Sequence, residues 1–289
     1  MGRSAHSAWP VGLQPRVRSG PVPGLLSVNP RAGDGRPSAD ELVAEAARCG
    51  IDAHVLASGE DPQEIARAND APVLGIAGGD GSLGSIATVA LERELPFVCV
   101  PFGTRNHFAR DIGLDRNDPV AALDAFDGQR ERLIDIGRAG ERVFLNNVSF
   151  GIYARLVHRR EQHRRRRDAF ARARALWLVA RHRRPEPIVV DGERIAARIV
   201  LVANNAYELT FLNVGERARL DEGSLHAYIA TEWYPRTWDE RTAQSFRVGG
   251  RGPKLRAAVD GEPAVLDSPV ELRVEPRALR VLLPPEREP

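Results

Sequence analysis

The chain has 289 residues, of which 43% are hydrophobic and 28% charged, and its formal net charge is +2. This balance is typical of one large or two modest domains. The chain contains no apolar run long enough to cross a bilayer, and residues 1–23 lack the apolar segment of a secretion signal. Residues 1–23 are therefore predicted to be a disordered tail, and the protein is predicted to be cytoplasmic.

The small net charge hides an uneven distribution. Twelve Arg and two acidic residues lie between positions 155 and 184, which gives this segment +10 and the remainder of the chain −8. The only Lys is Lys254, which is far in sequence from the glycine turn at residues 78–82. A Walker-type nucleotide site, which needs a lysine beside such a turn, is excluded.

Strands and helices are predicted to alternate in the first part of the chain. Apolar runs indicate strands at residues 25–28, 53–56, 73–77 and 96–100, and capping or helix-forming patterns indicate helices after Ser38, after Asp61, at residues 83–91 and at 118–126. Such alternation predicts an α/β nucleotide-binding domain with a parallel sheet over residues 24–129. Its ligand site should lie beyond the carboxyl ends of the strands.

Three loops follow these predicted strands: Asn29 to Gly33, Gly78-Gly79-Asp80-Gly81-Ser82, and Pro101 to Asn106. The backbone N–H groups of a glycine turn at a helix N-terminus bind phosphate oxygens well. Asp80 would repel a phosphate there unless it holds Mg²⁺ or accepts a proton, and the alternative is that Asp80 is only a helix N-cap. We expect the three loops to converge on one crevice.

After Gln129 the pattern changes to strands joined by short turns. Apolar segments at residues 133–137, 143–147, 187–190, 195–204, 225–230 and 270–274 predict a mainly antiparallel β domain over residues 130–289. Whether the last residues return to the first domain is left open. Cys49 and Cys99 are expected to be two buried thiols without a disulfide or metal.

Five motifs occur in one order along the chain: Asn29-Pro30-x-x-Gly33, Gly78 to Ser82, Pro101-x-Gly103-Thr104-x-Asn106, Asp135-Ile136-Gly137 and Asp260-Gly261-Glu262. Together they resemble the diacylglycerol kinase catalytic-domain family, whose superfamily includes sphingosine kinases and, more distantly, NAD kinases. The resemblance implies a nucleotide-binding first domain, a β-rich second domain and ATP in the cleft between them.

The resemblance also implies roles for individual residues. Asp80 and Asp135 would hold Mg²⁺, Asp80 would take part in catalysis, and Glu262 would be the general base on the lipid hydroxyl. Asp135 on its own could instead be a buried, hydrogen-bonded residue, and Asp260-Gly261-Glu262 a common hairpin turn. The implied nucleotide-contacting residues are Asn29, Gly33, Gly78, Gly79, Gly81, Ser82, Gly103, Thr104 and Asn106.

Two positions depart from the family pattern. His107 stands where the family typically has Asp directly after Asn106. This replacement removes one carboxylate from the expected metal-binding network. Arg217 stands where some relatives carry an acidic ligand of an accessory structural Mg²⁺, near Leu220-Asp221-Glu222-Gly223. We do not expect that accessory metal here.

The sequence therefore predicts an ATP- and Mg²⁺-dependent lipid kinase acting on diacylglycerol or a related lipid. An NAD kinase-like enzyme and a noncatalytic nucleotide- or lipid-binding member are the alternatives, the latter because of His107. The basic residues 159–167 are expected to dock the protein peripherally on the anionic inner face of a membrane. Nucleic-acid binding is not expected because no aromatic residues are interleaved in this run, and a homodimer is left open.

Overall fold

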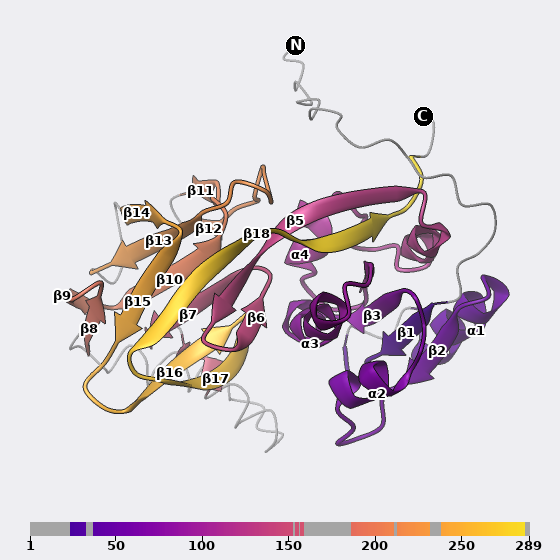
Figure 1. The fold of residues 1–289 in the computed structure, drawn as a ribbon, viewed down its shortest axis with the longest axis horizontal. Helices are drawn as coiled ribbons and strands as arrows, with labels where there is room; N and C mark the ends of the chain where they lie inside the picture. The colour runs from indigo at the N-terminus through magenta and orange to yellow at the C-terminus, as the bar shows by residue number, and fades with distance from the viewer. Residues whose placement is uncertain are drawn as a thin grey trace, which may run out of the picture.

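The computed structural model describes residues 24–32, 37–152, 154–155, 157–158, 186–210, 213–231 and 238–286. The predicted tail at residues 1–23, the first-loop residue Gly33 and the basic run at 159–167 lie outside the described residues. The described chain forms an α/β part, in indigo and purple in Figure 1, and a β-rich part in magenta, orange and yellow.

The α/β part contains a parallel sheet in the order β2-β1-β3-β4. Each strand except the exposed edge strand β2 is buried along its whole length. This burial explains why the strands read as continuous apolar runs. In chain order the elements are β1 (Leu25–Val28), α1 (Ala39–Arg48), β2 (Asp52–Val55), α2 (Pro62–Ala68), β3 (Leu74–Gly78), α3 (Asp80–Glu92), β4 (Phe97–Pro101), α4 (His107–Asp111) and the 3₁₀ helix η1 (Ala121–Asp127).

Local signals account for the starts of the predicted helices. The Ser38 hydroxyl accepts the N–H of Glu41 and the Glu41 carboxylate accepts the N–H of Ser38, so a capping box opens α1. Asp61 caps α2, whose first residue is Pro62. The predicted helix at 118–126 is instead the shorter 3₁₀ helix η1. Helix α4 has only five residues, too few for an apolar period to indicate it.

The β-rich part contains a second sheet in the order β14-β13-β10-β7-β16-β17, with every neighbouring pair antiparallel. The strands of this part are β5 (Arg130–Ala139), β6 (Arg142–Phe144), β7 (Asn147–Gly151), β8 (Glu186–Val190), β9 (Glu193–Ala197), β10 (Ile199–Asn204), β11 (Leu209–Thr210), β12 (Asn213–Val214), β13 (Leu225–Ala230), β14 (Asp239–Ala243), β15 (Ser245–Gly249), β16 (Lys254–Val259), β17 (Glu262–Asp267) and β18 (Val270–Leu283).

The prediction of one strand over residues 195–204 was wrong. Strand β9 pairs with β8 in the sheet that also contains the parallel strands β2-β1-β3-β4. At the end of β9 the chain turns at Arg198 and enters the second sheet as β10. The Arg198 N–H bonds to Ala230 O and its carbonyl accepts the N–H of Ile152, so the break is fixed by partners distant in sequence. An apolar run does not reveal a change of sheet, because β9 buries Ile195 and Ala197 and β10 buries most of its side chains.

The last strand, β18, joins the two parts. It pairs antiparallel with β15 and β5, and at Val281 it pairs parallel with Phe97 of β4. The register against β5 shifts between Glu275 and Leu279, a bulge in which Arg277 has φ +52°. Figure 1 shows β18 in yellow running beside β5 along the molecule. The parallel sheet and part of the β-rich region therefore belong to one continuous sheet.

Two hairpins have Asp-Gly turns with positive φ at both positions, +49° and +86° at Asp191-Gly192 and +46° and +82° at Asp260-Gly261. These values are those of the type I′ turns that match the twist of antiparallel strands. The second turn connects β16 to β17 and makes Glu262 the first residue of β17. The hairpin turn named as the alternative for Asp260-Gly261-Glu262 is therefore present.

The cysteine expectation is correct for one residue and wrong for the other. Both thiols are free, and Cys99 on β4 is buried. Cys49 is exposed, because it is the C-cap of α1 and follows the helix's buried face, which is carried by Leu42 and Ala46.

Strands β5 and β6 are closely packed at Gly137. Gly137 pairs with Phe144 of β6, and a Cβ at Gly137 would lie 2.1 Å from the Phe144 ring. We expect Gly137→Ala to lower the free energy of unfolding by about 1–3 kcal/mol, because overpacking forces side chains and backbone to shift. Urea denaturation monitored by circular dichroism measures this change.

Gly252→Ala is the matched control, because no atom lies within 4 Å of the position of its added Cβ. Its unfolding midpoint should stay near that of the unsubstituted protein. Equal midpoints for both variants would contradict the packing proposed at Gly137.

Candidate functional site

The second and third loops meet at their glycines. Strand β3 ends at Gly78, Gly79 is the N-cap of α3, and a Cβ placed on Gly103 would lie 2.4 Å from Gly79 Cα. A side chain at residue 103 would block this approach, whereas a Cβ on Gly79 would lie 3.6 Å from Gly103 Cα. The Ser82 hydroxyl donates to Gly79 O at 2.7 Å and closes the turn. The expected convergence of these two loops is confirmed.

The third loop is held in shape by Asn106. Its Oδ1 accepts the N–H of Gly103 at 2.9 Å, and its Nδ2 donates to Gly103 O at 2.8 Å. Asn106 is buried and left-handed, with φ +49°, whereas Thr104 is exposed. The amide of Asn106 therefore shapes the loop from within, whereas Thr104 and Arg105 lie on its surface.

The first loop begins beside the glycine turn. The Asn29 N–H bonds to Ala77 O at 2.9 Å, and its Oδ1 accepts the N–H of Arg31 at 3.1 Å. Because β1 and β3 are parallel neighbours, Asn29 and Gly78 follow at the same edge of the sheet. Asn29 thus joins the loops that carry Asp80 and Thr104.

The Asp80 carboxylate lies between three polar donors. It accepts the N–H groups of His107 at 3.1 Å and Phe108 at 2.9 Å, and Asn146 Nδ2 lies 3.4 Å from its Oδ1. Asp80 is the first residue of α3, not its N-cap. It caps the start of α4 instead, so the N-cap alternative names the wrong helix. The backbone N–H groups of His107 and Phe108 therefore hold the Asp80 carboxylate in position.

The turn between β16 and β17 is anchored by Asp260. Its buried carboxylate accepts the N–H groups of three consecutive residues, Leu145 at 2.8 Å, Asn146 at 2.8 Å and Asn147 at 2.9 Å. Burial and, secondarily, the nearby Asp80 charge raise the pKa of Asp260 to about 6, against the opposite effect of the three donors.

This anchoring brings Glu262 against the glycine turn. A Cβ on Gly81 would lie 2.2 Å from Glu262 Cγ and 2.6 Å from Glu262 Oε1. Two motifs that are distant in sequence therefore meet, and the space for Glu262 exists because residue 81 has no side chain. The geometry places a carboxylate beside the N-terminus of α3.

His107 follows the third loop and lies at the start of α4. Burial lowers the pKa of its imidazole, while the Asp80 carboxylate opposes this effect. The lowered pKa favours the neutral ring at neutral pH. His107 holds Asp80 through its backbone N–H, a contact that does not depend on the side chain at this position.

Asp135 is not among the residues brought to the glycine turn. Its carboxylate accepts the N–H groups of Gly223 at 2.6 Å and Arg277 at 2.8 Å, and within the described residues it shares no hydrogen-bond partner with Asp80. Burial raises the pKa of Asp135. This geometry agrees with the alternative of a buried, hydrogen-bonded residue that supports the bulge in β18.

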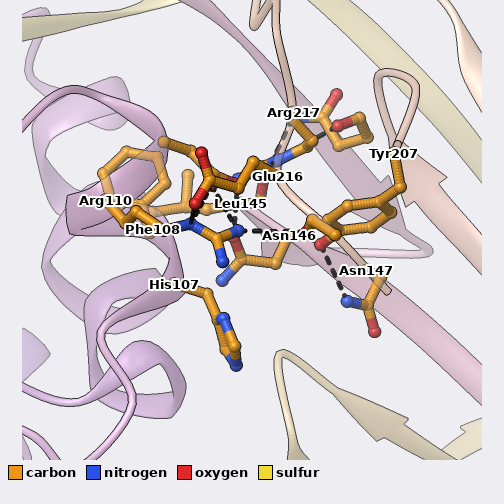
Figure 2. A network of polar contacts seen from close by, with 12 residues as sticks. His107, Phe108, Arg110, Leu145, Asn146, Asn147, Tyr207, Glu216 and Arg217 are labelled. Atoms are coloured by element: carbon orange, nitrogen blue, oxygen red, sulfur yellow. Dashed lines mark hydrogen bonds and ion pairs between the residues drawn. The ribbon is translucent and has the colours of Figure 1, made fainter. Parts of the chain in front are cut away.

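Sequence reasoning missed a polar network beside Asp80. Arg217 lies in the loop before β13 and donates to Asp111, Leu145, Asn146 and Asn204. Figure 2 shows its guanidinium reaching toward Leu145 and Asn146, with Tyr207 and Asn147 alongside. A buried arginine has no periodic signal, and only its departure from the family pattern marked the position.

Within the described parts of the chain, no group of three or more His, Cys, Asp or Glu side chains is arranged to hold a metal ion. A Mg²⁺ ion commonly uses only one or two protein carboxylates together with substrate phosphates and water. Asp80, partly exposed at the glycine turn, fits this second mode of binding.

Comparison with known proteins identifies the first part of the chain. Residues 23–139 match the model of the diacylglycerol kinase catalytic domain. These residues are similar to the diacylglycerol kinase catalytic-domain family. The match includes the three loops and Asp135, and it ends at the last residue of β5.

Two bacterial diacylglycerol kinases are similar in sequence. The protein from Bacillus subtilis (strain 168) is 32% identical over 84 residues, 28% of this chain and 28% of its own length. The protein from Mycobacterium tuberculosis (strain H37Rv) is 36% identical over 86 residues, 29% of this chain and 25% of its own length. The matched region thus spans about a quarter of the length of each relative.

The fold likeness extends much further than the sequence likeness. The crystal structure of a diacylglycerol kinase from Bacillus anthracis (strain Sterne) has a TM-score of 0.64 and 20% identity, and the match covers 91% of this chain and 97% of that one. At this identity the match shows the fold, an α/β region with a mostly parallel sheet followed by an antiparallel β region. None of the helices in the described ranges is long and apolar enough to span a membrane.

The pKa of Asp260 gives a test of the site's electrostatics. Its carboxyl group should titrate near pH 6 in ¹³C NMR, and its pKa should fall in Asp80→Asn because a neighbouring negative charge is removed. Since the folded pKa is raised, the contribution to stability is complete below about pH 4 and is lost as the pH rises through 6. The loss is about 2–3 kcal/mol.

Asp70→Asn is the control, because Asp70 is exposed and is not among the groups that shift Asp260. It should leave the titration of Asp260 unchanged. A pKa of Asp260 below 4 in the unsubstituted protein would contradict the balance in which burial outweighs the three N–H donors.

Proposed function

We propose that this protein is an ATP- and Mg²⁺-dependent lipid kinase that transfers the γ-phosphate to a hydroxyl of diacylglycerol or a related lipid. The single observation that carries the proposal is the placement of Glu262 against Gly81, beside Asp80 and the N-terminus of α3. The family of residues 23–139 and the names of the similar proteins support the same reaction class.

The nucleotide phosphates would bind at the start of α3. Gly78, Gly79, Gly81 and Ser82 form a turn that opens a 13-residue helix, whose N-terminal N–H groups and dipole attract anions. The exposed Thr104 would contact the nucleotide directly, and Asn106 and Gly103 would act by shaping their loop. Asn29 would contact the nucleotide at the same edge of the sheet, and Gly33, which lies outside the described residues, is proposed as a contact from the motif alone.

Asp80 would hold Mg²⁺, which when bound neutralises charge on the phosphates during transfer. The backbone donors of His107 and Phe108 keep the carboxylate in place for this role. Asp135, the other residue expected to hold the metal, bonds to Gly223 and Arg277. The proposal for the metal therefore depends on Asp80.

Glu262 would accept the proton of the lipid hydroxyl as that oxygen attacks the γ-phosphorus. A general base must lie within hydrogen-bond reach of this proton and close to the phosphates. The type I′ turn and the three bonds to Asp260 hold Glu262 at the glycine turn, and its side chain is exposed for a substrate to approach.

The noncatalytic alternative is motivated by His107, which replaces a carboxylate expected from the family resemblance. The contact between His107 and Asp80 is made by the backbone and survives this replacement, which favours an active enzyme. An NAD kinase-like activity has no separate structural support and is decided by the substrate panel below.

Access to a lipid requires contact with a membrane. We propose that residues 159–167 dock the protein peripherally on the anionic inner face, since each basic residue near such a surface contributes about 1 kcal/mol. These residues lie outside the described part of the chain, so the proposal rests on their charge alone.

The proposed reaction is tested with radiolabelled ATP and Mg²⁺ over a panel of lipids, with NAD as a competing acceptor. We expect phosphate transfer to diacylglycerol or a related lipid, and a loss of at least ~10²-fold in Asp80→Asn because a charge at the site of transfer is removed. Asp70→Asn should behave as the unsubstituted protein. Transfer to NAD alone, or to no acceptor, would refute the proposal.

The role of Glu262 is tested by Glu262→Gln, which keeps the shape of the side chain and removes its basicity. Turnover should fall by ~10²–10⁴-fold, the typical contribution of a general base, with little change in the KM for ATP. Glu271→Gln, at an exposed position of β18, serves as the matched control. Unchanged turnover at saturating lipid would remove Glu262 from the mechanism.

A further inference from the structure

A buried cation joins the α/β and β-rich parts close to Asp80. Arg217, 3% exposed, donates from Nε to Asp111 Oδ2 at 2.7 Å, from Nη1 to Leu145 O at 2.6 Å and Asn204 O at 3.0 Å, and from Nη2 to Asn146 Oδ1 at 2.6 Å. Four acceptors thus surround one guanidinium, as Figure 2 shows in part.

Arg217 determines which way the Asn146 amide faces. A guanidinium has only donors, so the end of the amide that contacts it must be the oxygen. The Asn146 NH₂ group is consequently turned the other way, and there it lies 3.4 Å from Asp80 Oδ1. The backbone of Asn146 is fixed in addition by its N–H bond to Asp260 at 2.8 Å.

A second path leads from Arg217 to Asp80 through α4. Asp111, at the end of this helix, bonds to Arg217, and its Oδ1 also accepts Arg110 Nη2 at 2.7 Å. The start of the same helix donates two N–H groups to Asp80. Because α4 is a single short turn, fixing its end also restricts its start. Both paths reach the same carboxylate.

We propose that Arg217 and Asn146 are positioning residues for Asp80. Arg217 orients the Asn146 amide so that its NH₂ group faces Asp80, and it holds the helix that supplies the other two donors. The catalytic consequence rests on the proposed kinase function, whereas the orientation of the amide does not. If Arg217 served only to stabilise the fold, the group that Asn146 presents to Asp80 would be immaterial.

Asn146→Asp separates these two roles. The new carboxylate keeps an oxygen for Arg217 Nη2, so the thermal midpoint should equal or exceed that of the unsubstituted protein. Its other oxygen replaces the donor to Asp80 with a second negative charge. We expect kcat to fall at least about tenfold with the KM for lipid little changed, since misplaced catalytic groups cost rate rather than binding.

The matched control is Asn147→Asp, the same change one position along the chain. Asn147 Nδ2 lies 3.1 Å from the Tyr207 hydroxyl, which can donate to the new carboxylate instead. Its kcat should stay within about twofold of the unsubstituted protein, as expected for a change that does not alter a catalytic group. A kcat at or above the unsubstituted level in Asn146→Asp would overturn the proposal.

NMR of the side-chain amide distinguishes this inference from the kinase function. The Asn146 NH₂ signals, identified by their loss in Asn146→Asp, should shift in Asp80→Asn and in Arg217→Lys, which has too few donors for four acceptors. They should stay in place in Asp70→Asn. Unchanged signals in Asp80→Asn would refute the positioning role, whereas absence of phosphate transfer in the unsubstituted protein would refute only the kinase function.

Discussion

The candidate site depends on three hydrogen bonds that the Asp260 carboxylate accepts from consecutive backbone N–H groups. These bonds fasten the β16–β17 turn to residues 145–147, where the chain passes from β6 to β7. Moving the turn would leave the buried N–H groups of Leu145 and Asn146 without acceptors, each at a cost of about 1–3 kcal/mol, and would also release the half-buried N–H of Asn147. Glu262 therefore stays against Gly81 while its own side chain remains accessible.

The same arrangement recurs at other carboxylates of this chain. Asp80 accepts two N–H groups from α4, and Asp135 accepts one from Gly223 and one from the bulge in β18. In each case a side chain satisfies backbone donors at the end of an element or at a bulge. Asp135 is consequently held away from Asp80, whereas Asp260 and Glu262 lie close to the glycine turn that carries Asp80.

Long β18 and the buried Arg217 hold the two parts of the molecule at a defined distance. Strand β18 continues the parallel sheet into the β-rich part through its pairing with β4 and β5. Arg217 then ties α4 to the loop at Leu145 and to Asn204 on β10. In the proposed reaction, a nucleotide at the α/β part and Glu262 on β17 would have to be held at a fixed separation, because small displacements of reacting groups are costly.

The sequence by itself determined the local structure of the α/β part and the identity of the glycine turn. Capping residues, proline positions and glycine turns act over a few residues, so the starts of α1 and α2 and the Asp-Gly hairpins could be predicted. Tertiary structure decided where β9 ends and β10 begins, and that Asp80 caps α4 and not α3. It also decided that Asp135 bonds to Gly223 and Arg277, and that Arg217 bonds to the amide oxygen of Asn146. These contacts join residues far apart in sequence, and their free energy depends on burial and on donor geometry that no local pattern records.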